Sequence, residues 1–414
     1  MNPHPFEKFQ LSKSILRAVI AEGYQEPTPV QHAAIPEVLA GRDIMATAQT
    51  GTGKTAAFAL PMLERLNVKA PGNSGGAGPI RGLVLTPTRE LALQVEESLR
   101  VYGRYLSLRS AVVLGGVSMD SQVKALRRNP DILVATPGRL LDLMQQGRVR
   151  LDKVEILVLD EADRMLDMGF IQDVRRIVSK VPPKRQTLFF SATMSTEIVA
   201  LAGDMLNNPA RIETTRPASV SQSIDQKVLF VDHANKRSLL AEILKGKDVR
   251  RVLVFTRTKH RADRLSRHLS DSGVSADAIH SNKSQGARQR ALAAFDCGKV
   301  MVLVATDIMA RGIDVEGISH VINYELPNDP ESYVHRIGRT ARAGAAGTAL
   351  SFCDASEIVM LQGIEKLTRS PLVADENHGF HSATIASLHS PRAGSAAKPS
   401  QWRSFGPRRN ARFR

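Results

Sequence analysis

The chain has 414 residues, long enough for two ordinary domains that each bury a core. Its 43% hydrophobic and 23% charged residues are typical of a soluble globular protein. The formal net charge of +15 favours a polyanionic partner; the alternative is a solvated basic surface that binds nothing. Residues 1–10 lack a signal-peptide pattern, and no apolar run approaches the ~20 residues that span a membrane. Cys297 and Cys353 lie too far apart for a metal knuckle or redox pair, so we expect a cytoplasmic protein without disulfides.

Short runs of Val, Ile and Leu recur along the chain, and most end in a small or polar cluster before a helical pattern. The predicted strands of the first half are Asp43–Thr47, Gly82–Thr86, Ala111–Leu114, Asp131–Ala135, Glu155–Leu159 and Thr187–Phe190. Those of the second half are Arg251–Phe255, Ser275–Ile279, Val300–Ala305, His320–Tyr324 and Thr348–Phe352. Apolar strands that alternate with helices predict parallel sheets covered on both faces. These strands are more than one such sheet usually holds, so the predicted fold class is α/β with two tandem doubly wound domains.

Three segments interrupt this pattern. Residues 213–222, which include Thr214 to Ser221, lack apolar periodicity and are predicted to be a linker between domains at 1–212 and 223–370. The Gly-rich stretch Ala70–Pro79 is predicted to be a surface loop. Gly, Ser, Pro and Arg dominate beyond residue 370, so we expect residues 371–414 to form a disordered basic tail.

A phosphate-binding loop is predicted directly after the first strand. It consists of Ala48, Gln49, Thr50, Gly51, Thr52, Gly53, Lys54 and Thr55. The backbone N–H groups of such a loop, together with the following helix N-terminus, hold phosphates. Lys54 would reach the β and γ phosphates of a nucleotide, and Thr55 would bind Mg²⁺. Ala48 replaces the first glycine of the general pattern, but the strand–loop–helix context disfavours a chance Gly-Lys-Thr turn.

An acidic cluster, Asp160-Glu161-Ala162-Asp163, follows a later apolar strand, at the place of a Walker-B carboxylate. Asp160 would hold Mg²⁺ through water, and Glu161 would orient and deprotonate the attacking water. Taken alone, these residues could be a helix N-cap with favourable charges. The phosphate-binding loop makes the catalytic interpretation the better one.

The remaining candidate motifs lie at the carboxyl ends of predicted strands, the edge where open α/β sheets bind ligands. They are Pro87-Thr88-Arg89-Glu90, Gly115-Gly116, Thr136-Pro137-Gly138-Arg139, Ser191-Ala192-Thr193, Thr256-Arg257 and Thr306-Asp307. Such residues suit contacts to a sugar–phosphate backbone, although each motif singly is most often a turn or helix cap. The basic run His335–Arg342 would repel itself without a nearby anion, which suggests arginine fingers; the alternative is an ordinary basic helix.

Together with Gly23-Tyr24 and Pro27–Gln31, these motifs resemble in order and spacing the motif series of DEAD-box RNA helicases, across residues 6 to 365. The stretch Ile279–Arg288 resembles the bacterial RhlE-type subgroup. Ala341 and Ser281 depart from the family pattern, which has glycine at both positions. We expect activity to survive the first change if Ala341 is helical. The resemblance implies two RecA-like domains that bind ATP, Mg²⁺ and RNA, and it argues against a DNA translocase.

The resemblance also implies roles for individual residues. Phe6 and Tyr24 would pack around adenine, Gln31 would read its edges, and Asp314 would meet the ribose. Residues expected to hold RNA are Pro87, Arg89, Gly116, Thr136, Gly138 and Arg139 on the first domain and Arg257, Arg288 and Thr306 on the second. Arg339 and Arg342 would be arginine fingers. Asp163, Ser191, Thr193 and His335 would couple domain closure to strand separation.

These residues predict a monomeric, RNA-stimulated ATPase that unwinds or remodels RNA with little sequence specificity. The rival interpretation is an RNA clamp that does not unwind, and intact Lys54, Glu161 and Arg339 argue against an inert version of it. From Asn377 onward the chain has no Asp or Glu. Seven cations lie there: Arg392, Lys398, Arg403, Arg408, Arg409, Arg412 and Arg414. With Trp402, Phe405 and Phe413 among them, we expect an electrostatic tether for RNA; the alternative is a solubilising terminus.

Overall fold

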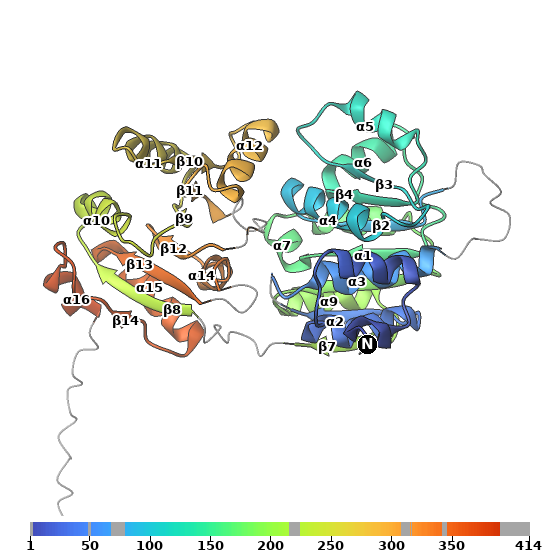
Figure 1. Ribbon diagram of the computed structural model, residues 1–414, viewed down its shortest axis with the longest axis horizontal. Coiled ribbons are helices and arrows are strands. Elements are labelled where there is room, and N and C mark those ends of the chain that lie inside the picture. The colour runs from blue at the N-terminus through green and yellow to red at the C-terminus, as the bar shows by residue number, and fades with distance from the viewer. Residues whose placement is uncertain are drawn as a thin grey trace, which may run out of the picture.

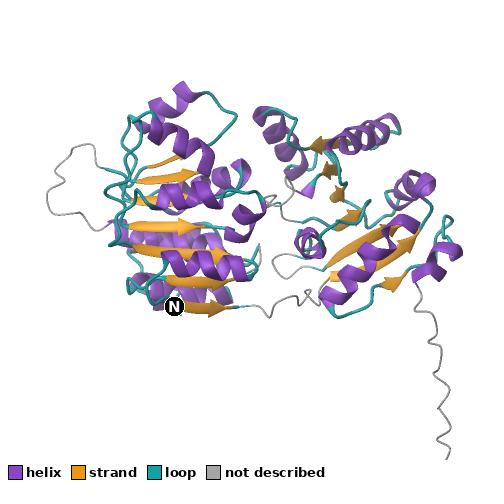
Figure 2. Cartoon of the chain, turned by 180° about the vertical axis from the view of Figure 1, so that it is seen from behind, coloured by secondary structure: helices purple, strands orange, loops and turns teal. Residues whose placement is uncertain are grey.

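The computed structural model describes residues 3–48, 51–67, 79–214, 224–307, 315, 317–341 and 346–389. Two α/β domains lie side by side, each with helices on both faces of a central sheet (Figures 1 and 2). Within these ranges each domain contains a sheet of seven strands, and all strand pairs are parallel.

The sheet of the first domain has the strand order β3-β4-β2-β5-β6-β1-β7. Its strands are β1 (Ile44–Thr47), β2 (Gly82–Leu85), β3 (Ser110–Val113), β4 (Ile132–Ala135), β5 (Ile156–Leu159), β6 (Gln186–Ser191) and β7 (Ala210–Glu213). The helices are η1 (Pro5–Phe9), α1 (Lys13–Ala21), α2 (Pro29–Leu39), α3 (Lys54–Asn67), α4 (Arg89–Tyr102), α5 (Met119–Leu126), α6 (Pro137–Gln145), α7 (Ala162–Asp167), α8 (Ile171–Val178) and α9 (Thr196–Met205). Because β6 lies between β1 and β5, the loops after these three strands meet at one edge of the sheet.

The second domain repeats this plan with the order β10-β11-β9-β12-β13-β8-β14. Its strands are β8 (Ile224–Phe230), β9 (Val252–Phe255), β10 (Ala276–Ile279), β11 (Val302–Ala305), β12 (His320–Asn323), β13 (Gly347–Cys353) and β14 (Val373–Ala374). The helices are η2 (His233–Asn235), α10 (Lys236–Ile243), α11 (Lys259–Asp271), α12 (Gln285–Asp296), α14 (Pro330–Ile337), η3 (Ala355–Glu357), α15 (Ile358–Thr368) and α16 (Ala383–His389).

Side chains of the central strands alternate between two cores, one on each face of the sheet. In the first domain Val84 and Val158 belong to the core under α2, α3 and α4. Leu83 and Leu157 belong to the core on the other face. Successive side chains of a strand point to opposite faces of the sheet, and both faces are buried. Nearly every residue of these strands is therefore apolar, which explains the nearly continuous apolar runs in the sequence.

All eleven predicted strands are confirmed, with ends that differ by one or two residues. Three strands escaped prediction: β7, β8 and β14. The expected tail boundary at residue 371 is wrong. Residues 371–389 add β14 and α16 to the second domain, where Leu372 and Ile385 are buried in a core.

The described part of the chain agrees with the other expectations of organisation. The first sheet ends at Glu213 and the second begins at Ile224; residues 215–222 of the predicted linker lie outside the described residues. So do the predicted loop from residue 70 to 78 and the tail from 390 to 414. Both cysteines are free thiols. Within the described ranges, no helix combines the length and apolarity needed to cross a bilayer.

Candidate active site

The predicted phosphate-binding loop joins β1 to the N-terminus of α3, which begins at Lys54. Ala48 is buried, and its N–H donates to the Ser191 carbonyl at 3.0 Å, so the loop leaves the sheet beside β6. Gly51 and Gly53 have positive φ angles of 83° and 88°, which favour glycine at both positions. Thr52 and Thr55 are half-buried in the same turn, while Gln49 and Thr50 lie outside the described residues.

Gln31 connects the phosphate-binding loop to helix α2. Its Nε2 donates to the Gly53 carbonyl at 3.1 Å, and its Oε1 accepts from the Thr28 N–H at 3.0 Å. A Cβ at Gly53 would lie 2.4 Å from the Gln31 Nε2, so glycine is required for this contact. Gln31, predicted to read adenine, is therefore fully buried and also caps α2.

The two predicted adenine-contacting aromatic residues pack edge to face. The Phe6 and Tyr24 ring centroids are 5.8 Å apart at an interplanar angle of 85°. Phe6 is fully buried, whereas Tyr24 is partly exposed. The Tyr24 hydroxyl forms a 2.7 Å hydrogen bond with the Tyr102 hydroxyl, which orients the Tyr24 ring.

Lys54 and Asp160 are buried charged side chains, and in the described part of the chain one polar atom of each has no hydrogen-bond partner. The Lys54 Nζ and the Asp160 Oδ1 are both enclosed in this way. Burial raises the pKa of Asp160 to about 6, although the nearby Lys54 charge opposes this rise. Leaving such groups unpaired in a protein interior is costly. The pair therefore fits an ionic ligand such as a nucleotide phosphate with its cation.

Glu161 belongs to the first domain and lies beside two residues of the second domain, Arg339 and His335. It caps α7 in a left-handed conformation, with φ of 54°, and pairs with Arg164 at 3.1 Å. Burial by itself would raise the pKa of Glu161, but Arg164 and Lys54 lower it. Arg339 and His335 of the second domain lower it further, so the Glu161 carboxyl is held as a carboxylate.

The predicted coupling residues are also brought together. The Asp163 Oδ2 accepts from the N–H groups of Ala192 and Thr193 at 3.1 and 3.0 Å. The Ser191 Oγ accepts from the Asp163 N–H at 3.2 Å and donates to the Thr193 carbonyl at 2.7 Å. His335 lines the same small pocket as Glu161, Asp163 and Ala192. The acidic cluster is thus connected to β6 and to the second domain.

The residues predicted to hold RNA on the first domain lie along the carboxyl edge of the sheet. Arg89 lies against Gly116, where a Cβ would come within 2.1 Å of the Arg89 Nη1. Arg139 donates to the Val117 carbonyl at 3.2 Å. Gly138 is exposed with open space around it, so another backbone can approach closely there. Pro87 and the α6 N-cap Thr136 are buried beside them.

One contact between the domains involves a predicted RNA residue. Arg288 at the start of α12 pairs with the Glu90 Oε1 of the first domain, and the Gln285 Nε2 donates to the same oxygen at 3.1 Å. All three side chains are buried. Arg288 therefore joins the domains in this structure, and Glu90 and Gln285 are interface residues that the sequence interpretation had left without a role.

On the second domain, the side chains of the basic run have different surroundings. Arg336, one cation of the run expected to need a nearby anion, is fully buried and donates to both carboxylate oxygens of Asp307, from Nη2 at 2.8 Å. Asp307, which follows β11, is therefore the nearby anion for this arginine, and the arginine-finger roles of Arg339 and Arg342 stay predictions. Arg339 is also buried, whereas Thr306 is half-buried. Arg257 is held by buried carboxylates described below.

Two predicted ligands, Asp314 and Arg342, lie outside the described residues. Ala341, which precedes Arg342 in the sequence, is not helical: helix α14 ends at Ile337, and Ala341 has a left-handed φ of 54°. Activity is expected to survive the change from glycine to alanine if Ala341 is helical, and the structure does not meet this condition. Gly347 accommodates this turn, because a Cβ there would lie 2.2 Å from the Thr340 Oγ1.

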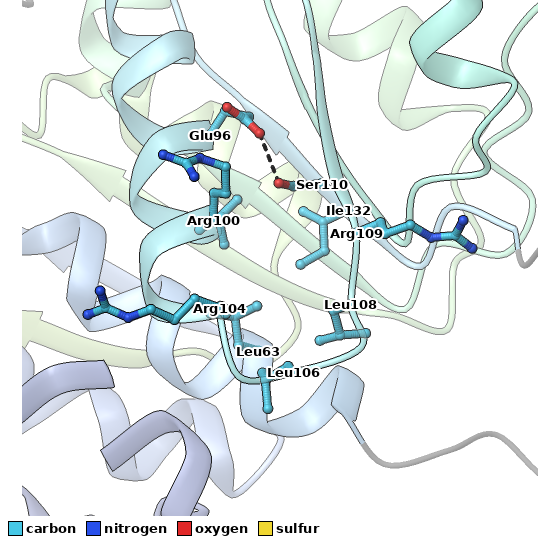
Figure 3. Close-up of a pocket in the computed structure, with 11 residues that line it drawn as sticks. Leu63, Glu96, Arg100, Arg104, Leu106, Leu108, Arg109, Ser110 and Ile132 are labelled. Atoms are coloured by element: carbon cyan, nitrogen blue, oxygen red, sulfur yellow. Dashed lines mark hydrogen bonds between the residues drawn. The ribbon is translucent and has the colours of Figure 1, made fainter. Parts of the chain in front are cut away.

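A larger hollow of about 330 Å³ lies at the opposite, amino-terminal edge of the first sheet (Figure 3). Leu99, Leu108 and Ile132 are among its apolar lining residues, and the Ser110 hydroxyl donates to Glu96 at 3.0 Å beside them. It contains none of the predicted site residues. The chemistry therefore belongs to the carboxyl edge, where the motifs converge.

Comparison with known proteins agrees with this geometry. Residues 28–201 match the DEAD/DEAH box helicase family, and residues 235–344 match the helicase conserved C-terminal domain. The chain is 43% identical to the DEAD-box ATP-dependent RNA helicase CshA of Bacillus licheniformis over 364 residues, 88% of this chain and 73% of that protein. It is 42% identical to CshA of Bacillus subtilis, over 88% of this chain and 72% of that protein.

Among solved structures, S. cerevisiae Dbp5 bound to RNA and ADP BeF3 is similar with a TM-score of 0.81 and 31% identity. The match covers 90% of this chain and 96% of that chain. It spans both domains, so their relative arrangement is also similar. The sequence motifs, the two parallel sheets and these relatives show that the chain belongs to the family of DEAD-box ATP-dependent RNA helicases.

Proposed function

We propose that this chain hydrolyses ATP when RNA is bound, and that it uses this cycle to unwind or remodel short RNA duplexes and RNA–protein complexes. One observation carries the proposal. Glu161 follows the apolar strand β5 in the first domain, and Arg339 and His335 of the second domain line the same small pocket and lower the pKa of its carboxyl. A catalytic carboxylate completed only by domain closure is suited to hydrolysis that depends on a second ligand.

Lys54, Thr55 and Asp160 would hold the phosphates of ATP and Mg²⁺. The unpartnered Lys54 Nζ and Asp160 Oδ1 fit these ligands. Among the described residues no group of three or more His, Cys, Asp or Glu side chains could hold a metal alone. That suits Mg²⁺, which is usually bound through one or two carboxylates together with substrate phosphates and water. The cation would neutralise phosphate charge, while Glu161 orients water and accepts its proton.

RNA would lie across the carboxyl edges of both sheets. Arg89, Gly116, Gly138 and Arg139 line this edge on the first domain. Contacts to phosphates and 2′-hydroxyls carry little sequence information, so we propose weak sequence specificity and a preference for RNA over DNA. The relatives named above are RNA helicases, and the Dbp5 structure holds RNA.

Several finer assignments remain part of the proposal. The RhlE-type subgroup rests on Ile279–Arg288 alone, and the similar bacterial proteins named above are CshA helicases. A monomer in the cytoplasm, domains divided within residues 213–222, and an RNA-binding tail within residues 390–414 are likewise proposed. The rival role is a clamp or remodelling scaffold that binds RNA without productive unwinding, and the intact Lys54, Glu161 and Arg339 argue against an inert version of it.

ATPase assays with RNA and DNA strands of the same sequence test this function. We expect RNA to stimulate turnover much more than DNA, and we expect a short RNA duplex to separate in the presence of ATP. Arg339→Ala should abolish the stimulation while leaving ATP binding nearly intact, because its contact exists only between closed domains. Arg339→Lys should rescue only partly, since lysine lacks the planar guanidinium. Equal stimulation by DNA would contradict RNA as the proposed substrate. If the protein binds the RNA duplex but does not separate its strands, the clamp is the better interpretation.

A further inference from the structure

The second domain contains a buried charge cluster that the proposed hydrolysis does not use. Lys236, at the start of α10, is 0% exposed and pairs with Glu357, which is also 0% exposed. The Lys236 Nζ also contacts the Asp354 Oδ2 at 3.0 Å. Burying such charges is expensive, and an apolar pair of similar size would often be at least as stable. The cluster therefore calls for an explanation other than stability.

The Glu357 carboxylate holds several groups in place. Its Oε1 accepts from the Arg257 Nη2 at 2.9 Å and from the Leu326 N–H at 3.1 Å. Its Oε2 accepts from Lys236 and from the Asp354 N–H at 3.3 Å. Lys236 thus balances the charge of Glu357 from one side, while the other oxygen reaches Arg257.

A second buried carboxylate, that of Glu325, also contacts Arg257. The Glu325 Oε2 accepts from the Arg257 N–H at 2.9 Å, and the Glu325 Oε1 lies 3.6 Å from the Arg257 Nη2. Glu325 also pairs with Arg261. Both the backbone and one edge of the guanidinium of Arg257 are therefore anchored from inside the domain.

The Nη1 of Arg257, on the other edge of the guanidinium from the carboxylates, is a donor that can bind a ligand. The side chain is 24% exposed, and within the described ranges its Nη1 has only a 3.9 Å contact with the Met360 sulfur, a weak acceptor. Arg257 follows β9, in the same sheet edge as Arg288, which meets the first domain. An arginine held in this way loses less side-chain entropy when it binds a phosphate.

We propose that Lys236 and Glu357 are positioning residues for RNA binding: the buried pair holds Arg257 so that its free edge faces an RNA phosphate. This inference rests on the proposed RNA contact of Arg257. Glu357 would act through Arg257 and would not touch RNA itself. Lys236 would offset the negative charge of Glu357 inside the domain, so that Glu357 can hold the guanidinium through a charge-assisted hydrogen bond.

RNA-stimulated ATPase assays on a double-mutant cycle test the proposal in the full chain. Arg257→Ala and Glu357→Gln should each raise the apparent KM for RNA, by about tenfold for a lost charge-assisted hydrogen bond. For Glu357→Gln, which removes no group that touches RNA or ATP, the KM for ATP without RNA and the turnover number at saturating RNA should change little. Combining the two substitutions should give no further rise beyond Arg257→Ala, because Glu357 then has nothing to position.

A matched control is Glu365→Gln in the same helix α15 as Met360. The Glu365 carboxylate accepts from the Leu372 N–H at 2.9 Å and contacts His389 at 2.8 Å, away from Arg257. Its loss should lower the unfolding midpoint without changing the KM for RNA. If Glu357→Gln does not fold, Lys236→Met combined with Glu357→Met replaces the whole buried pair by apolar side chains and should raise the KM for RNA in the same way.

The outcomes separate the inference from the function on which it rests. An unchanged KM for RNA in Arg257→Ala would refute the RNA contact of Arg257. If Arg257→Ala raises this KM but Glu357→Gln does not, the positioning role is wrong. It is also wrong if the effects of the two substitutions multiply in the double variant, because Glu357 would then act independently of Arg257.

Discussion

Replacing Ala341 by glycine is expected to stabilise the second domain, although glycine usually weakens a folded chain. Ala341 has a φ of 54°, outside any helix or strand. A left-handed backbone costs a residue with a Cβ about 1–2 kcal/mol. Glycine avoids this cost, but its freer unfolded chain offsets about 0.4–1 kcal/mol of the gain. We therefore expect the free energy of unfolding to rise by roughly 0.8 kcal/mol, the difference between the midpoints of these two ranges.

Calorimetry of the full chain can measure this effect. A gain of 1 kcal/mol shifts the midpoint of a domain of this size by about 2–4 °C. The matched control is Ala293→Gly, an exposed position inside helix α12 of the same domain, which should lower the stability by about 1 kcal/mol. The two variants identify the second-domain transition, because they should shift it in opposite directions. A lower midpoint for Ala341→Gly would refute the strain argument.

Three further outcomes follow from the site. Lys54→Ala should weaken both nucleotide binding and hydrolysis. Glu161→Gln should still bind ATP and RNA but hydrolyse ATP slowly. Near wild-type turnover in Glu161→Gln would exclude Glu161 as the general base. Burial raises the pKa of Asp160 to about 6, so kcat/KM for ATP should fall as the pH drops through that value and the carboxylate becomes neutral. A pH profile that is flat on both sides of it would contradict the role of Asp160. Deleting residues 390–414 should weaken RNA binding and flatten its salt dependence, by up to ~0.7 log units per lost phosphate contact, and superimposable salt plots would exclude the tether.

The sequence predicted the central strands well because their burial on both faces leaves a continuous apolar signal. Strand β5, Ile156–Leu159, is an example: all four residues are buried. Strand β7 carries alternating polar residues at the edge of the sheet, and β14 is only two exposed residues, so neither has this signal. Helix α16 was missed for a similar reason, since a single buried residue, Ile385, anchors it within a polar segment.

The site was predictable where one motif carries the chemistry, and not where two distant segments share it. Lys54 and Asp160 follow strands in a recognisable pattern, and among the described residues the structure buries the Lys54 Nζ and the Asp160 Oδ1 without a hydrogen-bond partner. By contrast, Glu90 lies inside a quoted motif, but its partner Arg288 is almost two hundred residues away. The internal anion Asp307 for Arg336 was missed in the same way, because pairing across strands has no periodic signature.

Two places where described residues of the two domains meet offer a route by which ATP and RNA would influence each other without touching. Glu90 meets Arg288 beside the residues proposed to hold RNA, and Arg339 acts on Glu161 beside those proposed to hold the nucleotide. Each domain is packed densely enough to move as one body. When the domains approach each other at one of these contacts, the residues of the other contact therefore approach as well. A ligand that bridges the domains at either place therefore favours the arrangement that the other ligand needs. By linkage the effect must be reciprocal: RNA should tighten ATP binding by the same factor by which ATP tightens RNA binding.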